Sequence, residues 1–176
     1  MKSRVRWADS QRSRQLWTGN CGPALASLLL ERIVMVTLAD ARKVIAAAEK
    51  KATEIKQPMN IAVVDEGGNL VSHVRMDGAW IGSIDISINK AFTSRAFDSS
   101  TRDLAQHSQS GGQFFGIHVS NHGRVMVFAG GIPLKRDGRI VGAVGVSGGS
   151  GEQDHTVAEA GAQAFYVRTG EQLDGK

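Results

Sequence analysis

The 176-residue chain is poor in cysteine and proline and contains no long apolar run. Its one cysteine, Cys21, cannot form an internal disulfide, and a single thiol excludes a CxxC metal site and a CxxCH haem attachment. No apolar stretch approaches the roughly 20 residues of a membrane-spanning helix, so we expect no membrane span. HExxH and P-loop motifs are absent as well. The sequence therefore names no nucleophile and does not decide whether the chain is an enzyme.

The excess of positive charge is confined to the first fifth of the chain. The net charge is +4, and residues 1–34 contain six basic and two acidic residues, whereas residues 35–176 contain 15 of each. Binding to nucleic acid needs a basic patch on the folded part of a protein. We therefore expect no nucleic-acid partner.

Residues 1–34 differ in character from the rest. Their basic residues are irregularly spaced, and the basic start is far from the short apolar run that would form the core of a secretory signal. We interpret this segment as a leader or upstream extension outside the fold, with a transit peptide as the alternative, and residues 35–176 as one domain. We expect a cytoplasmic protein, secreted or targeted only if the leader is a genuine signal.

The domain is predicted to start with a helix and a β-hairpin. Apolar residues recur at three- and four-residue spacing over residues 38–55, which is typical of an amphipathic helix. Thr37 is suited to cap its start, and Pro58 requires that it has ended. Residues 59–76 then read as two strands joined by a Glu-Gly-Gly-Asn turn.

Three more helices and three short strands are predicted further along. A helix over residues 81–97 has Ile81, Ile84, Ile88 and Phe92 on one face, and a short helix opens with a capping box at Ser100. The predicted strands are 124–128, 132–135 and 140–146, and a last helix extends to about Phe165. Because strands joined by tight turns pair antiparallel, the fold class is α+β, with a sheet of about five strands flanked by helices.

Four segments resemble the GlcG/HbpS family, also called haem-degrading domains and found as the C-terminal part of PduO-type proteins. The segments are 37–48, 59–77, 83–97 (SIDISINKAFTSRAF) and 130–164. The resemblance implies a profilin- or PAS-like antiparallel sheet flanked by helices. It also implies assembly into dimers or larger rings, so we expect a homo-oligomer.

The same resemblance suggests a haem or other tetrapyrrole ligand. Such a ligand needs an apolar slot, an axial ligand if the iron is coordinated, and cations for its propionates. His107, His118 and His122 are candidate iron ligands, with Phe114 and Phe115 between them in the least regular part of the chain. The alternative is a polar loop whose aromatic rings fill the core.

Lys90, Arg95 and Asp77 are candidate ligand-binding residues. Lys90 stands at a position that recurs in the family, which suggests binding of a carboxylate or propionate. The alternative is a surface lysine whose stem lies over apolar neighbours. Arg95 is about 140° from Lys90 around the helix and does not share its face. Asp77 follows a strand and could orient a ligand or cap the helix after it.

A glycine-rich segment, Gly145–Gly151, precedes the last helix. Gly148 and Gly149 could expose backbone N–H groups to an anion at the helix N-terminus, or the glycines could serve close packing. Asp154-His155 follows, where relatives commonly have Asp-Glu. The histidine is either a private ligand or, as we favour, an exposed residue of the first helical turn.

Three functions remain open on the sequence alone. The first is a tetrapyrrole-binding protein with or without haem breakdown. The second is an accessory protein or enzyme for a small carboxylate or hydroxy acid of glycolate or diol metabolism, using Lys90 and the glycine-rich segment. The third is a purely structural oligomer subunit.

Overall fold

A computed structural model describes residues 35–166 of the chain, so the interpretation of residues 1–34 as a leader lies outside the described part. The described helices and strands are α2 (Leu38–Glu54), β1 (Asn60–Asp65), β2 (Leu70–Arg75), α3 (Gly82–Ala96), α4 (Thr101–His107), β3 (Gly131–Arg136), β4 (Arg139–Ser147) and α5 (Gly151–Tyr166). Two short 3-10 helices, η1 (Ile117–Val119) and η2 (Asn121–Gly123), lie between α4 and β3.

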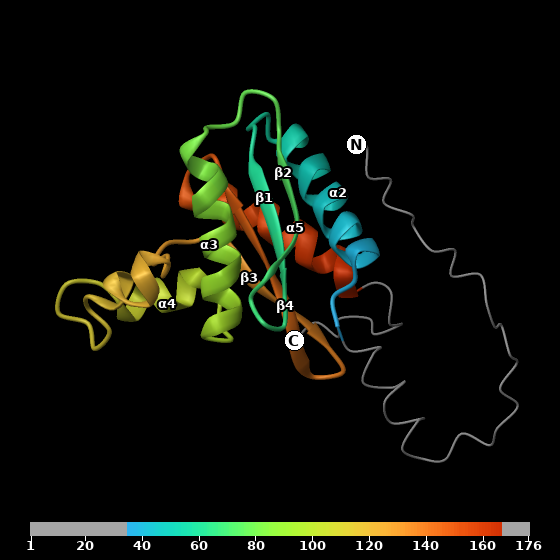
Figure 1. Cartoon of the computed structure of the whole chain (residues 1–176). Coiled ribbons are helices and arrows are strands. Elements are labelled where there is room, and N and C mark those ends of the chain that lie inside the picture. Colours follow the sequence, from blue (N-terminus) through green and yellow to red (C-terminus); the bar gives the residue numbers. More distant parts are fainter. Residues whose placement is uncertain (1–34, 167–176) are drawn as a thin grey trace, which may run out of the picture. The chain divides into compact units, whose positions relative to one another are not determined.

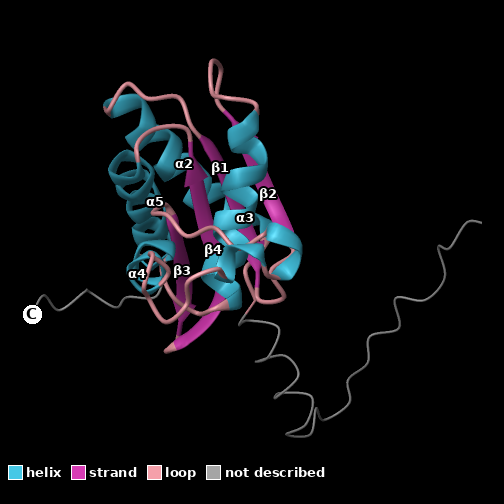
Figure 2. Ribbon diagram, turned by 90° about the vertical axis from the view of Figure 1, so that its left-hand side faces the viewer, coloured by secondary structure: helices cyan, strands magenta, loops and turns pink. Residues whose placement is uncertain are grey.

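The four strands form one antiparallel sheet in the order β2-β1-β4-β3. Helices α2 and α5 cover one face and α3 covers the other (Figure 1), while β2 and β3 lie at the two margins of the sheet (Figure 2). The predicted α+β class with an antiparallel sheet flanked by helices is therefore confirmed.

The predicted helix starts are also confirmed. Thr37 forms a capping box with Asp40 at the start of α2. The Ser100 side chain accepts the Asp103 N–H at the start of α4, as the capping-box pattern predicted. Each cap satisfies N–H groups that the first helical turn leaves without partners, which is why these local signals were readable in the sequence.

One predicted strand is wrong. Residues 124–128 are not in the sheet, which has four strands instead of about five. Val125 is buried, but the Met126 N–H donates to Thr93 Oγ1 at 2.9 Å. A side chain of α3, and not a neighbouring strand, therefore provides the hydrogen-bond partner for this backbone N–H. For this reason the apolar run 124–128 has the length of a strand but does not join the sheet.

The two faces of the sheet are packed differently. Under α2 and α5 lies the main apolar core, which includes Ile61, Val63, Val144 and Val146. Under α3 the packing is close and the residues are small: the buried side chains of this helix include Ser83, Ser87, Ala91 and Ser94. The apolar spacing predicted that α3 is a helix, but it indicated the wrong side as the one that faces the sheet. Ile81 is 72% exposed, and Ile84 and Ile88 are only half-buried.

Gly145 of β4 is the residue that permits this close approach. A Cβ placed on it would collide with the carbonyl oxygen of Ser87 and the backbone nitrogen of Ala91. Both atoms belong to the backbone of α3, so the collision can be relieved only by moving the helix away from the sheet.

We therefore expect Gly145→Ala to lower the free energy of unfolding by about 3 kcal/mol or more, since overpacking here displaces a whole helix. Urea denaturation followed by circular dichroism measures this. Gly82→Ala, at a position with nothing within 4 Å of the added Cβ, is the matched control and should leave stability nearly unchanged. Equal effects of the two substitutions would contradict this account of the α3 contact.

Candidate functional site

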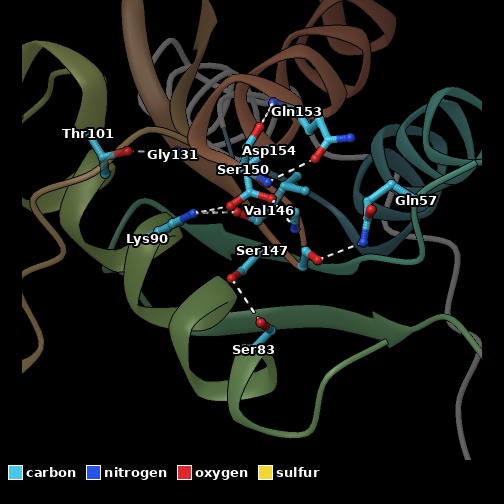
Figure 3. A network of polar contacts seen from close by, with 12 residues as sticks. Gln57, Ser83, Lys90, Thr101, Gly131, Val146, Ser147, Ser150, Gln153 and Asp154 are labelled. Atoms are coloured by element: carbon cyan, nitrogen blue, oxygen red, sulfur yellow. Dashed lines mark hydrogen bonds and ion pairs between the residues drawn. The ribbon is translucent and has the colours of Figure 1, made fainter. Parts of the chain in front are cut away.

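The most unusual group in the described part of the chain is the side chain of Lys90, on the sheet-facing side of α3. It is 0% exposed. Its Nζ donates to Asp154 Oδ2 at 2.6 Å and to the Val146 carbonyl at 3.0 Å, and it lies 4.2 Å from the centroid of the Phe128 ring. Figure 3 shows the ammonium reaching from α3 toward Asp154 near the start of α5. A buried ammonium is thus surrounded by one carboxylate, one carbonyl and one aromatic face.

Asp154 is held from its other side by the glycine-rich segment. Its Oδ1 accepts the Gly149 N–H at 2.9 Å, and the Gly148 N–H also lowers the pKa of the carboxyl. Burial raises the pKa of Asp154 and lowers the pKa of Lys90, while the contact between the two groups opposes both shifts. The charged forms of Lys90 and Asp154 are therefore stabilised by each other and by hydrogen bonds from and to the backbone.

Asp154 is the binding partner of two groups that the sequence predicted to bind an anion. The glycine-rich segment does present N–H groups to an anion, and Lys90 does bind a carboxylate, but in both cases the carboxylate is that of Asp154. The alternative of a surface lysine is wrong, because Lys90 has no exposed area.

Further polar contacts fix the elements around the pair (Figure 3). Gln57 Nε2 donates to the Gly148 carbonyl at 2.8 Å, and the Ser83 and Ser147 hydroxyls lie 3.2 Å apart. Ser150 and Gln153 form a reciprocal cap at the start of α5. The pair is therefore anchored by contacts that reach α3, β4, α5 and the segment that follows α2.

Removing one partner of this pair should be far more harmful than removing both. Lys90→Met leaves a buried carboxylate without its counter-charge, which costs about 3–5 kcal/mol, whereas an apolar pair of similar volume is often tolerated. We expect the Lys90→Met/Asp154→Leu double variant to be more stable than Lys90→Met in urea denaturation. The single variant Asp154→Leu is measured as well. If the stability loss of the double variant equals the sum of the losses in Lys90→Met and Asp154→Leu, the two side chains do not act as a coupled pair.

The predicted loop residues belong to one segment, residues 107–122, and are open to solvent. His107, His118 and His122 are exposed, and Phe114 and Phe115 are 42% and 66% exposed. Within the described residues, the only ring contact of the three imidazoles is the edge-on packing of His107 against Phe114, with centroids 6.0 Å apart. The aromatic rings therefore do not fill the core.

The backbone of this loop is under constraint. Asn121 and His122 have φ values of 50° and 59°, followed by Gly123 at 74°. Positive φ is costly for residues with a Cβ, and such conformations concentrate at functional segments.

Arg95 and Asp77 lie elsewhere. Arg95 forms an ion pair with Asp98 just beyond the end of α3, and its Nε is buried without a hydrogen-bond partner in the described residues. Asp77 is exposed in the turn after β2. The idea that Asp77 caps the next helix is wrong, because Ile81 occupies the N-cap of α3 and no side chain caps it.

His155 is buried, contrary to the exposed position that we favoured. It is 7% exposed, and its Nε2 lies 3.1 Å from Glu159 Oε1. It lines a surface cavity of about 370 Å³ between α4 and α5, and Ser100, Ile132 and Tyr166 line both this cavity and a neighbouring one of about 570 Å³. Neither cavity is lined by any of the ligand-binding or iron-ligating residues predicted from the sequence.

The described residues contain neither a metal-binding cluster nor a membrane-spanning helix. Among them, no three His, Cys, Asp or Glu side chains lie close enough to hold a metal ion. No helix in residues 35–166 has the length and apolar character to cross a membrane.

The family model described as "Haem degrading protein HbpS-like" matches residues 36–163, nearly the whole described domain. The chain belongs to this HbpS-like family.

Individual relatives agree with this assignment. An uncharacterised 15.0 kDa protein from the dhaT–dhaS intergenic region of Citrobacter freundii is 42% identical over 135 residues, which cover 77% of this chain and 95% of that protein. The crystal structure of Klebsiella pneumoniae ORFY matches with a TM-score of 0.73 at 40% identity, covering 74% and 90% of the two chains. A PduOC–haem complex matches with a TM-score of 0.69 at 32% identity, covering 72% and 91%.

Sequence reasoning missed two residues of this HbpS-like domain. Asp154 was not among the candidate ligand-binding residues, and its spacing after the glycine-rich segment was the available signal. His73, on β2, has a buried Nε2 without a hydrogen-bond partner in the described residues, and burial lowers the pKa of its imidazole. The alternating pattern of the strand gave no sign that this nitrogen is buried.

The lowered pKa of His73 makes stability depend on pH. The folded state holds the neutral imidazole, so the unfolded chain binds the proton first, and stability falls as the pH drops through about 6.5, the ordinary histidine value, toward the lower folded value. We expect His73→Gln to lose less stability than the wild type between about pH 7.5 and pH 5.5 in urea titrations. Parallel losses in the two proteins would show that His73 is not responsible.

Proposed function

We propose that this HbpS-like protein binds haem or a related tetrapyrrole, and that residues 107–122 form one wall of the binding site. The observation that carries the proposal is the concentration of exposed apolar and imidazole side chains on this one segment. Phe115 is 66% exposed and Val119 is 73% exposed, next to the exposed imidazoles of His118 and His122. A solvent-exposed group of this kind is a recurrent mark of a binding surface.

The chemistry of the segment fits a planar apolar ligand with a central metal. Phe114 and Phe115 would pack on a flat ring, and a neutral imidazole nitrogen of His107, His118 or His122 would supply an axial ligand. Bound haem would supply the redox chemistry of its iron. The protein's part would be to hold the ring, exclude water from one face and offer the nitrogen.

The relatives support the same class of ligand. The family description names haem degradation, and PduOC, a solved relative, was crystallised with haem. We limit the proposal to binding, since no nucleophile or general base stands out in the sequence.

The small-carboxylate hypothesis has less support. It depended on Lys90 and on the Gly148 and Gly149 N–H groups, and all of these interact with Asp154 inside the fold. A propionate would therefore have to find its cation elsewhere than at Lys90. The hypothesis of a purely structural subunit is separated from ligand binding by the experiment below.

Titration of the full-length protein with hemin, followed by absorbance, tests the proposal. We expect a saturable, shifted Soret band near one equivalent. Phe115→Ser should weaken binding about tenfold, because it removes part of an aromatic contact worth 1.5–3 kcal/mol when fully buried. Replacement of the coordinating histidine, tested as His107→Ala, His118→Ala and His122→Ala, should change the position of the band.

Trp80→Ser provides the matched control. Trp80 is as exposed as Phe115, at 66%, but lies between β2 and α3, outside the proposed wall. It should leave hemin affinity unchanged. Unsaturable binding that none of these substitutions alters would mean adsorption, and the proposal would then fail.

A further inference from the structure

The guanidinium of Arg124 is fixed on two sides but has no acidic partner among the described residues. Its Nε donates to Asn89 Oδ1 at 3.2 Å, and its central carbon lies 3.8 Å from the centroid of the Phe92 ring. No described carboxylate lies within ion-pair distance of it. By contrast, three other arginines each pair with a carboxylate: Arg95, Arg102 and Arg136.

Both groups that hold this guanidinium are themselves held. Asn89 is only 8% exposed, and its Nδ2 lies 3.3 Å from Asp85 Oδ2, which leaves Oδ1 as the atom that faces Arg124. The Phe92 ring is backed by the turn between β1 and β2, because a Cβ placed on Gly68 would lie 3.1 Å from Cδ2 of the ring. The guanidinium therefore has one position before any ligand arrives, and binding through it costs little ordering of the side chain.

The two terminal nitrogens of Arg124, Nη1 and Nη2, are left for another acceptor. Within the described part of the chain the hydrogen bond of this side chain is made by Nε alone. The side chain is half-buried, and neither terminal nitrogen is a buried atom without a partner. Two parallel N–H donors on a planar guanidinium match the two oxygens of a carboxylate.

Arg124 lies at the end of the proposed wall of the tetrapyrrole site, residues 107–122. It follows η2 directly, and its N–H donates to the Asn121 carbonyl at 3.2 Å. Its carbonyl accepts the Thr93 hydroxyl at 3.2 Å, which joins this end of the wall to α3. A fixed cation thus stands two residues from His122, one of the candidate iron ligands.

We propose that Arg124 binds a propionate of the tetrapyrrole, so that the site prefers tetrapyrroles with free carboxylates. This inference rests on the proposed function and supplies the cation that Lys90 cannot provide, since Lys90 is paired with Asp154 inside the fold. Asn89 and Phe92 act as positioning residues, because they hold the guanidinium and leave its terminal nitrogens to the ligand.

The test compares two ligands on the full-length protein by absorbance titration. One is hemin, and the other is the iron complex of protoporphyrin IX dimethyl ester, in which both carboxylates are esterified. We expect the wild type to bind hemin about tenfold or more tightly than the ester, because the contact is a charge-assisted hydrogen bond. Arg124→Gln should lose most of this preference and bind the ester as the wild type does. Arg124→Lys keeps the charge without the fork and should show an intermediate preference.

Arg42→Gln is the matched control. Arg42 is exposed on α2, which covers the other face of the sheet from α3, and its replacement should leave the preference for hemin unchanged. Equal affinity of the wild type for the two ligands overturns the inference but leaves haem binding intact, and so does an unchanged preference in Arg124→Gln. An equal loss of affinity for both ligands in Arg124→Gln also overturns it, since Arg124 then has only a structural role. Absence of saturable hemin binding overturns it together with the proposed function.

Discussion

The buried ion pair between Lys90 and Asp154 is the interaction on which the rest of the domain depends. It joins the middle of α3 to the first turn of α5 and, through the Val146 carbonyl, to the end of the central strand β4. A charge can be held at such depth only if its partner and its hydrogen bonds are in place, so the pair imposes one relative position on these three elements. The absence of a side chain at Gly130 belongs to the same constraint, because a Cβ there would lie 2.9 Å from the Lys90 ammonium.

Because of this pair, the charge of Lys90, which the sequence suggested for ligand binding, is used inside the domain. The features that most resemble an anion site in the sequence are satisfied inside the fold. On the surface, the 107–122 segment presents exposed phenylalanines and imidazoles on a backbone that includes two non-glycine residues with positive φ. A rigid interior and an exposed loop carrying the binding residues is a common division of roles in proteins. Here it favours a large planar ligand over a small acid.

The sequence predicted well where structure is determined locally. The caps at Thr37 and Ser100, the hairpin of β1 and β2, and the helix at 82–96 all follow from short-range patterns. The sequence-based prediction failed where the structure of a segment depends on a residue far away in the sequence. Residues 124–128 have the composition of a strand but bond to Thr93 of α3, and α3 turns small residues to the sheet because Gly145 admits a close helix. Nothing near His155 in the sequence indicates that it is buried. The sequence named Lys90 as a candidate residue, but it did not indicate that the partner of Lys90 is Asp154 inside the fold.

The central claim is that the charge of Lys90 is used within the fold and is not presented to a ligand. Native-state acylation of lysine amines, followed residue by residue with mass spectrometry, tests it most directly. Lys43 and Lys135, both exposed, provide the reference rates. The account predicts that Lys90 reacts only at the rate of global unfolding and that its labelling rises steeply as urea is added. Reaction of Lys90 in the native protein at a rate close to those of Lys43 and Lys135 would contradict it.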